Sequence, residues 1–149
     1  MRIAIGTDHA GFCLKSTVMD AVRAMGHEVI DFGTNDESRV DFPDYARLVA
    51  EAVQKGEADR GIAVCGSGVG VCIAANKVQG VYACVCHDIY SAHQGVEHDG
   101  MNVLCLGGKV VGTELARELV TAFLQATPVA EERYLRRIKK VKTIESNRG

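Results

Sequence analysis

The chain has 149 residues, of which 47% are hydrophobic and 24% are charged. This balance and length are typical of one folded domain, which we expect to cover residues 1–149. The formal net charge of −2 argues against a general nucleic-acid binder. No stretch approaches the roughly 20 apolar residues of a membrane span, and Asp8 interrupts the N-terminal apolar run that a secretory signal would need. We therefore expect a cytoplasmic protein with no membrane partner and with reduced cysteines.

Apolar runs alternate with helical patterns along the chain. The apolar runs predict strands at residues 2–6, 28–33, 60–65, 80–86 and 102–108. Amphipathic segments predict helices at 14–26, 41–56, from the turn after residue 65 to about 77, from the turn after residue 86 to about 96, and at 113–124 and 130–146. Continuous apolar strands separated by helices indicate a parallel sheet that is covered on both faces. We predict a single three-layer α/β/α domain with a five-stranded parallel Rossmann-like sheet.

Ligands of such folds bind beyond the carboxyl ends of the strands. The segments that follow the predicted strands are therefore expected to hold the functional residues. These segments are TDHAG at 7–11, the stretch 32–43, CGSGVG at 65–70, CHDIY at 86–90 and GGK at 107–109.

The glycine-rich turn at 66–70 has few side chains, so backbone N–H groups can converge there on an anion. The simplest alternative is a tight β–α turn that binds nothing. A dinucleotide site is a second alternative, but Val71 breaks the G-x-G-x-x-G pattern and the turn follows the third strand instead of the first. Asp88, about twenty residues later, keeps a nucleotide site under consideration.

Cys65 ends a predicted buried strand directly beside this turn. A thiol in that position is suited to proton abstraction, with the adjacent N–H groups stabilising the resulting oxyanion. We interpret the other five cysteines as small buried apolar residues. The CVC sequence at 84–86 is a weak metal signal because its two side chains point to opposite faces of a strand. A thiol redox protein is disfavoured because the chain has no C-x-x-C motif.

The last predicted helix is rich in Lys and Arg, which usually indicates a solvated basic face. At about 100° per residue, Tyr134, Ile138, Val141 and Ile144 form one apolar stripe. Arg133 and Arg137 lie at the edge of that stripe, where a guanidinium group needs an anionic partner. A phosphoryl group fits both. We expect this helix to pack at least partly on a neighbouring subunit.

Six motifs occur in order along nearly the whole chain: TDHAG, VIDFGT, DFPDYA, CGSGVGVCIAANKVQGVYACVC, HDGMNVLCLGGKVVG and ERYLRRI. Together they resemble the family of ribose-5-phosphate isomerase type B and the galactose- and allose-6-phosphate isomerases. The resemblance implies an aldose–ketose isomerase of a sugar phosphate that uses no metal and no cofactor. It further implies a homodimer or homotetramer whose sites are shared between subunits.

The resemblance also implies roles for individual residues. Cys65 would remove the proton next to the carbonyl, forming a cis-enediolate, and Ser67 would supply the loop hydroxyl. His98 would open the sugar ring, although without the family it is equally well a surface histidine in a polar loop. The substrate-binding residues would be Asp8, His9, Gly66, Gly68, Val69, Gly70, Asp99 and Lys109, with Arg133 and Arg137 binding phosphate.

Three positions depart from the pattern common in the family. Asp99 stands where Asn is common, and a carboxylate accepts but does not donate a hydrogen bond to a substrate hydroxyl. Phe42 replaces a tyrosine, and Lys109 replaces a frequent arginine. The expected substrate is ribose 5-phosphate, with tetrose or hexose phosphates as competitors. A non-catalytic module that binds a phosphosugar or nucleotide is the alternative from another functional class, but such a module would not need a base.

Overall fold

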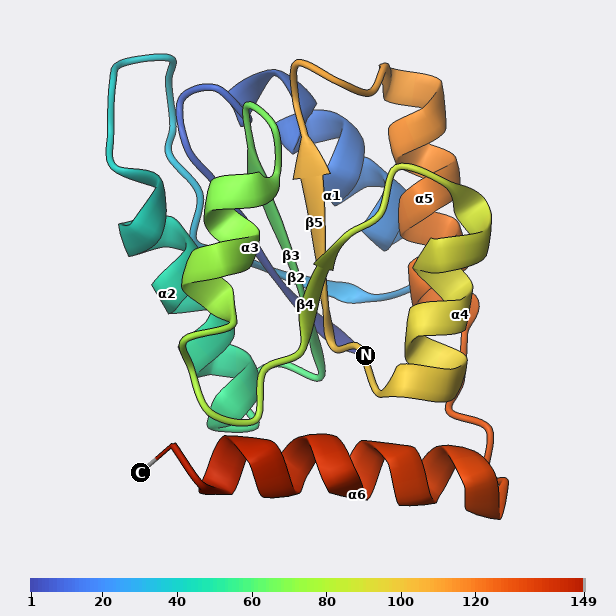
Figure 1. Ribbon diagram of the computed structural model, residues 1–149. Coiled ribbons are helices and arrows are strands. Elements are labelled where there is room, and N and C mark those ends of the chain that lie inside the picture. Colours follow the sequence, from blue (N-terminus) through green and yellow to red (C-terminus); the bar gives the residue numbers. More distant parts are fainter. Residues whose placement is uncertain (149) are drawn as a thin grey trace.

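The computed structural model describes residues 1–148 and has five parallel strands in the order β2-β1-β3-β5-β4 (Figure 1). The strands are β1 (Arg2–Thr7), β2 (Glu28–Asp31), β3 (Arg60–Cys65), β4 (Ala83–Val85) and β5 (Val103–Gly107). The predicted parallel sheet is therefore confirmed.

Helices cover both faces of this sheet, as predicted. A short 3₁₀ helix (η1, Phe12–Leu14) leads into α1 (Lys15–Ala24), which packs with α4 (Ile89–Asp99) and α5 (Thr113–Gln125) on one face. The helices α2 (Phe42–Gln54) and α3 (Val69–Ala75) cover the other face. Side chains alternate between the two cores along each strand, so Val64 faces α1, α4 and α5 while Cys65 faces α2 and α3.

The two largest differences between the predicted and the observed element boundaries concern β4 and α4. Strand β4 begins at Ala83 because the preceding residues form a loop, in which the Asn102 side chain accepts the Tyr82 N–H at 2.8 Å. Helix α4 continues three residues beyond the predicted end and stops at Asp99, where Gly100 adopts a left-handed φ of +74°. His98 thus lies in the last turn of a helix and not in a polar loop, as its alternative interpretation as a surface histidine assumed.

Helix α6 (Glu132–Ser146) lies across one end of the molecule, along the amino ends of the strands (Figure 1). None of its residues is buried. Tyr134, Ile138 and Glu145 are its half-buried residues, whereas Ile144 is 60% exposed. The predicted stripe is therefore corrected in its second half, since Val141 is also exposed and Glu145 occupies the place expected for Ile144. Among residues 1–148, no helix is both long and apolar enough to cross a lipid bilayer.

The loops at the carboxyl ends of β1, β3 and β5 approach one another closely. The Asp8 N–H donates to the Val64 carbonyl at 3.1 Å, and the Gly108 N–H donates to the Cys65 carbonyl at 2.7 Å. A Cβ atom on Gly11 would lie 2.6 Å from the Val64 carbonyl carbon. Glycine is therefore required at position 11 by a close approach of two backbones.

We predict that Gly11→Ala lowers the free energy of unfolding by about 1–3 kcal/mol, because its methyl group forces these loops apart. Chemical denaturation measures this loss. Gly112→Ala is the matched control, since a Cβ there meets no atom within 4 Å. That variant is expected to lose no more than about 1 kcal/mol, the preference for Gly over Ala at a helix N-cap. Equal losses in the two variants would contradict the prediction.

Candidate active site

The Cys65 thiol lies at the carboxyl end of β3 and is 5% exposed. The chain turns back over the sulfur, and the Gly68 N–H donates a hydrogen bond to Sγ at 3.2 Å. This turn requires glycine, since Gly68 has a φ of +80° and a Cβ there would lie 2.9 Å from the Leu106 carbonyl carbon. An N–H donor directed at the sulfur stabilises negative charge on it.

The loop after Cys65 leads into α3. The Ser67 hydroxyl oxygen accepts the Val69 N–H at 3.2 Å, and the Gly66 carbonyl accepts the Lys109 N–H at 3.0 Å. The N–H groups in the first turn of a helix have no carbonyl partner within that helix. The arrangement therefore offers backbone donors, a hydroxyl and a lysine beside one thiol.

Asp8 and His9 follow β1 and lie at the same edge of the sheet as Cys65, because β1 and β3 are parallel neighbours. The Asp8 carboxylate is buried, and its Oδ1 accepts the Gly11 N–H at 2.9 Å. Nδ1 of His9 accepts the Val40 N–H at 3.2 Å. We call the predicted site residues at this edge the carboxyl-edge group, which comprises Asp8, His9, Cys65, Gly66, Ser67, Gly68, Val69, Gly70 and Lys109.

The remaining predicted site residues lie at the opposite edge. Helix α4 starts at the carboxyl ends of the strands and runs back to their amino ends, which places His98 and Asp99 near α6 (Figure 1). The His98 ring stacks on Tyr134 of α6, with 4.0 Å between ring centroids and 6° between planes. Arg133 and Arg137 are on the same helix. We call His98, Asp99, Arg133 and Arg137 the amino-edge group.

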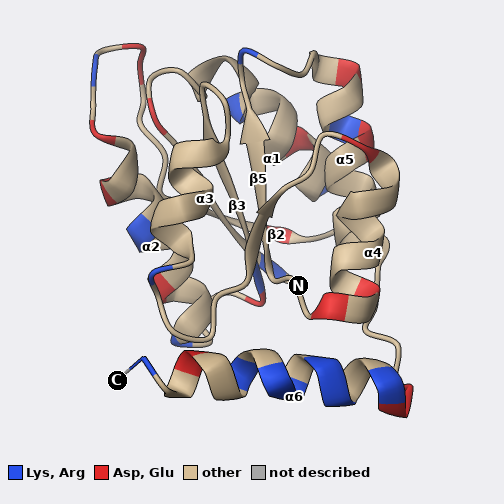
Figure 2. Cartoon of the chain, in the orientation of Figure 1, with Lys and Arg blue, Asp and Glu red and all other residues tan. Residues whose placement is uncertain are grey.

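The amino-edge group is cationic. Figure 2 shows Lys and Arg side by side along α6, with acidic residues near its ends. The guanidinium carbons of Arg133 and Arg137 lie 4.7 and 5.9 Å from the centre of the Tyr134 ring. Arg133 pairs with Glu131 at 2.9 Å, whereas Arg137 has no ion pair among residues 1–148. Arg137 is thus available to bind an anion.

The structure adds two residues that the sequence analysis did not assign to the site. Nε2 of His87 accepts the Gly107 N–H at 3.0 Å, which places its ring at the carboxyl end of β5. A Cβ on Gly70 would lie 2.9 Å from the Phe42 ring, so this ring packs against the start of α3. Phe42 had been noted only as a departure from a family pattern. The signal for His87 was its position directly after a strand.

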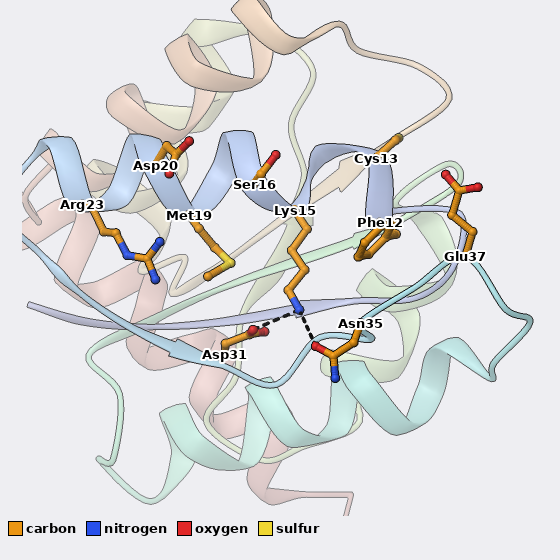
Figure 3. A pocket seen from close by; sticks show the side chains of 10 residues that line it. All are labelled: Phe12, Cys13, Lys15, Ser16, Met19, Asp20, Arg23, Asp31, Asn35 and Glu37. Carbon is orange, nitrogen blue, oxygen red and sulfur yellow. Dashed lines mark hydrogen bonds and ion pairs between the residues drawn. The ribbon is translucent and has the colours of Figure 1, made fainter.

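Lys15 also escaped the sequence analysis, because a lysine in an amphipathic helix is normally solvated. Its ammonium group is nearly buried and makes contacts at 2.9 Å with Asp31 and 3.3 Å with Asn35 (Figure 3). It also donates to the Thr34 carbonyl at 2.8 Å. These contacts hold the segment after β2 against α1. That segment continues to Val40, which contacts His9. Lys15 therefore supports the loop that borders the carboxyl-edge group.

The thiols of Cys72, Cys86 and Cys105 have different environments and therefore different pKa values. Hydrogen bonding, mainly with Cys105, lowers the pKa of Cys72 to about 7. Burial raises the pKa of Cys86 to about 12, and the hydrogen bond with Cys72 together with burial raises that of Cys105. The expectation that the other five cysteines are buried is confirmed for Cys86 and Cys105 and was wrong for Cys13 and Cys84, which are exposed, while Cys72 is half-buried.

Residues 3–141 match the family described as Ribose/Galactose Isomerase. Ribose-5-phosphate isomerase B of Escherichia coli is 46% identical over 148 residues, which cover 99% of each chain. D-erythrulose-4-phosphate isomerase of Pectobacterium atrosepticum is 41% identical over 128 residues, covering 85% of this chain and 84% of the relative.

Solved structures of ribose-5-phosphate isomerase B are also similar to this chain. Ribose-5-phosphate isomerase B of Clostridium thermocellum has a TM-score of 0.95 at 46% identity and covers all of both chains. Ribose-5-phosphate isomerase B of Mycoplasma genitalium, with bound ribulose-5-phosphate, has a TM-score of 0.90 at 39% identity, covering 97% of this chain and 96% of that one.

We predict that iodoacetamide alkylates Cys72 at pH 7 and leaves Cys86 and Cys105 unmodified in the folded chain. With a pKa of about 7, roughly half of the Cys72 side chains are thiolates at that pH, and the thiolate is the reactive form. Alkylation of Cys72 should slow as the pH falls below 7. Peptide mass spectrometry measures it, with Cys72→Ser as the control. Equal labelling of the three thiols would contradict the prediction.

Proposed function

The chain belongs to the Ribose/Galactose Isomerase family, and from this premise we propose that it interconverts ribose 5-phosphate and ribulose 5-phosphate. It is an aldose–ketose isomerase of the ribose-5-phosphate isomerase type. The observation that carries the choice of substrate is the full-length similarity to ribose-5-phosphate isomerase B, including the structure that holds ribulose-5-phosphate.

Cys65 is the base in this proposal. Its thiolate removes the proton from C2 of the open-chain aldose, and the C2 electron pair forms the double bond of a cis-enediolate. The same proton then returns to C1 while a hydroxyl proton passes from O2 to O1, so no external oxidant or reductant is consumed. The Gly68 N–H, 3.2 Å from Sγ, supports the thiolate before the proton is taken.

Backbone N–H groups stabilise the charge that develops on the enediolate oxygens. The loop at Gly66–Gly70 supplies these donors without side chains that would keep the substrate away. Because the backbone donors are fixed before the reaction, little reorganisation is needed when charge appears. Asp8, held by the Gly11 N–H, contributes an acceptor for a substrate hydroxyl.

We further propose that each site is shared between two subunits. The carboxyl-edge and amino-edge groups lie at opposite ends of the 11-residue helix α4, which is about 16 Å long. A five-carbon sugar phosphate cannot contact both ends within one chain. In a homodimer, one subunit supplies Cys65 and its loop, while its partner supplies His98 to open the ring and Arg133 and Arg137 to bind phosphate.

A four-carbon sugar phosphate is the second candidate substrate. The erythrulose-4-phosphate isomerase relative, at 41% identity, favours it. Asp99 is exposed at the end of α4 and would accept a hydrogen bond from a substrate hydroxyl. Phe42, which packs against Gly70, offers a ring without a hydroxyl beside the loop. Asp99 and Phe42 are therefore the residues expected to influence which sugar length and which hydroxyl pattern the site prefers.

We predict that ribose 5-phosphate gives the highest kcat/KM in a panel of four-, five- and six-carbon aldose phosphates assayed for ketose formation.

We expect Cys65→Ser to lower kcat about 10²–10⁴-fold on ribose 5-phosphate, because a hydroxyl replaces the thiol base. Circular dichroism checks the fold of the variant, and Cys13→Ser is the control at an exposed cysteine. Full activity of Cys65→Ser would exclude Cys65 as the base, and a preferred tetrose phosphate would replace the proposed substrate.

Subunit complementation tests the shared site. Cys65→Ser and His98→Ala/Arg137→Ala chains should each be nearly inactive, but together they should recover about a quarter of wild-type activity. With random pairing, half of the dimers are mixed, and each mixed dimer has one intact site of two. Co-expression with two different affinity tags isolates the mixed dimer. If that dimer is no more active than the parent variants, the two groups do not meet across an interface.

A further inference from the structure

Helix α6 is attached to the rest of its subunit at only a few points. At its start, the Val129 N–H donates to the Glu97 carbonyl at 2.9 Å, and Tyr134 stacks on His98. In its middle, Ile138 lies against Gly100. Since no residue of α6 is buried within its own subunit, packing against that subunit leaves the orientation of this helix weakly determined.

The far end of α6 is held by a carboxylate. Oε1 of Glu145 accepts the Gly80 N–H at 2.7 Å, and Oε2 accepts the Tyr82 hydroxyl at 3.0 Å. We call this arrangement the Glu145 clasp. Glu145 lies eleven residues after Tyr134, which returns it to nearly the same face of the helix. The clasp and the Tyr134–His98 stack therefore hold one face of α6 at both ends.

The loop that receives Glu145 is braced on its other side. The Asn102 side chain donates to the Gly80 carbonyl at 2.9 Å and accepts the Tyr82 N–H at 2.8 Å. Gly80 has a φ of +80°, a conformation that favours glycine. The two donors are thus oriented by the fold. Burial and the contact with Glu145 raise the pKa of Tyr82, so its hydroxyl remains a donor over the neutral pH range.

The stability of α6 itself does not explain a carboxylate at this position. The carboxyl end of a helix carries partial negative charge, which disfavours an acidic side chain in the last turn. Glu145 lies in that turn of a helix that is otherwise rich in Lys and Arg. The carboxylate is instead stabilised by its contacts with the loop at Gly80–Tyr82, outside the helix.

We propose that Glu145 is a positioning residue, which fixes the tilt and rotation of α6 and thereby holds Arg137 and Arg133 where they bind the substrate phosphate. This inference rests on the proposed function of the two arginines. Arg137 is eight residues from Glu145, or about 12 Å along the helix. A misplacement of about 1 Å in a group that contacts the substrate is enough to weaken its contribution strongly, and for a phosphate-binding arginine that contribution is to substrate binding.

The experiment compares Glu145→Ala, Tyr82→Phe and Arg137→Ala with wild type, using Glu132→Gln as the matched control. Glu132 is an acidic residue of the same helix that pairs with Arg136, away from the clasp. We expect Glu145→Ala to raise KM for ribose 5-phosphate about 5–10-fold while kcat stays within about twofold, because binding of the phosphate is weakened more than the chemistry. Tyr82→Phe should show a smaller rise, and Glu132→Gln none.

A double-mutant cycle separates positioning from a general structural effect. If Glu145 acts through the two arginines, adding Glu145→Ala to a chain that carries both Arg133→Ala and Arg137→Ala raises KM no further. Hydrogen exchange should also become faster in α6 of Glu145→Ala but not in the sheet. An unchanged KM in Glu145→Ala, multiplying effects in the cycle, or unchanged exchange in α6 would each overturn the positioning role.

The same measurements distinguish this inference from the proposed function. If Arg137→Ala raises KM and Glu145→Ala does not, only the positioning role fails. If Arg137→Ala itself leaves KM unchanged, the assignment of this arginine to phosphate binding is wrong, and the positioning role through it is wrong as well.

Discussion

The structure depends most on the close approach of three loops around the end of β3. Backbone hydrogen bonds from Asp8 to Val64 and from Gly108 to Cys65 join the loops after β1 and β5 to the strand that ends in the thiol. Gly11 permits this approach because it has no side chain. The position of Cys65 is therefore set by main-chain contacts on both sides. A side chain held in this way needs little rearrangement before a ligand binds beside it.

The second constraint is the direction of α4. A helix that follows a parallel strand must return across the sheet before the next strand begins, so it carries residues from the carboxyl edge to the amino edge. His98 is at the end of that return and stacks on Tyr134 of α6. One chain consequently presents a thiol with its backbone donors at one edge and an imidazole with two guanidinium groups at the other. This separation is the physical reason for proposing a site between subunits.

Helix α6 belongs to the amino-edge group, yet its own subunit covers it only in part. Tyr134 and Ile138 supply its apolar contacts, and the Glu145 clasp supplies polar ones at the far end. Such polar contacts are directional, whereas apolar contacts between exposed surfaces are not. A helix that has to present two cations in a defined orientation benefits from that directionality. The clasp therefore links the loop before β4 to the proposed phosphate site.

Patterns local in the sequence were enough to predict most of the strands and helices and to single out Cys65 as a candidate site residue. Apolar runs and glycines carried enough information to predict the parallel sheet and the glycine turn, because both depend on patterns local in the chain. The late start of β4 at Ala83 was less predictable, since the Asn102 side chain, twenty residues away, holds Tyr82 in a loop. The end of α4 is a local feature, because Gly100 adopts the left-handed conformation that closes the helix. The three-dimensional fold was needed to see that His98 and Cys65 lie at opposite edges, that Lys15 is a buried cation, and that Glu145 rather than Ile144 faces the domain. These facts depend on contacts between residues distant in sequence, which periodicity within one element does not encode.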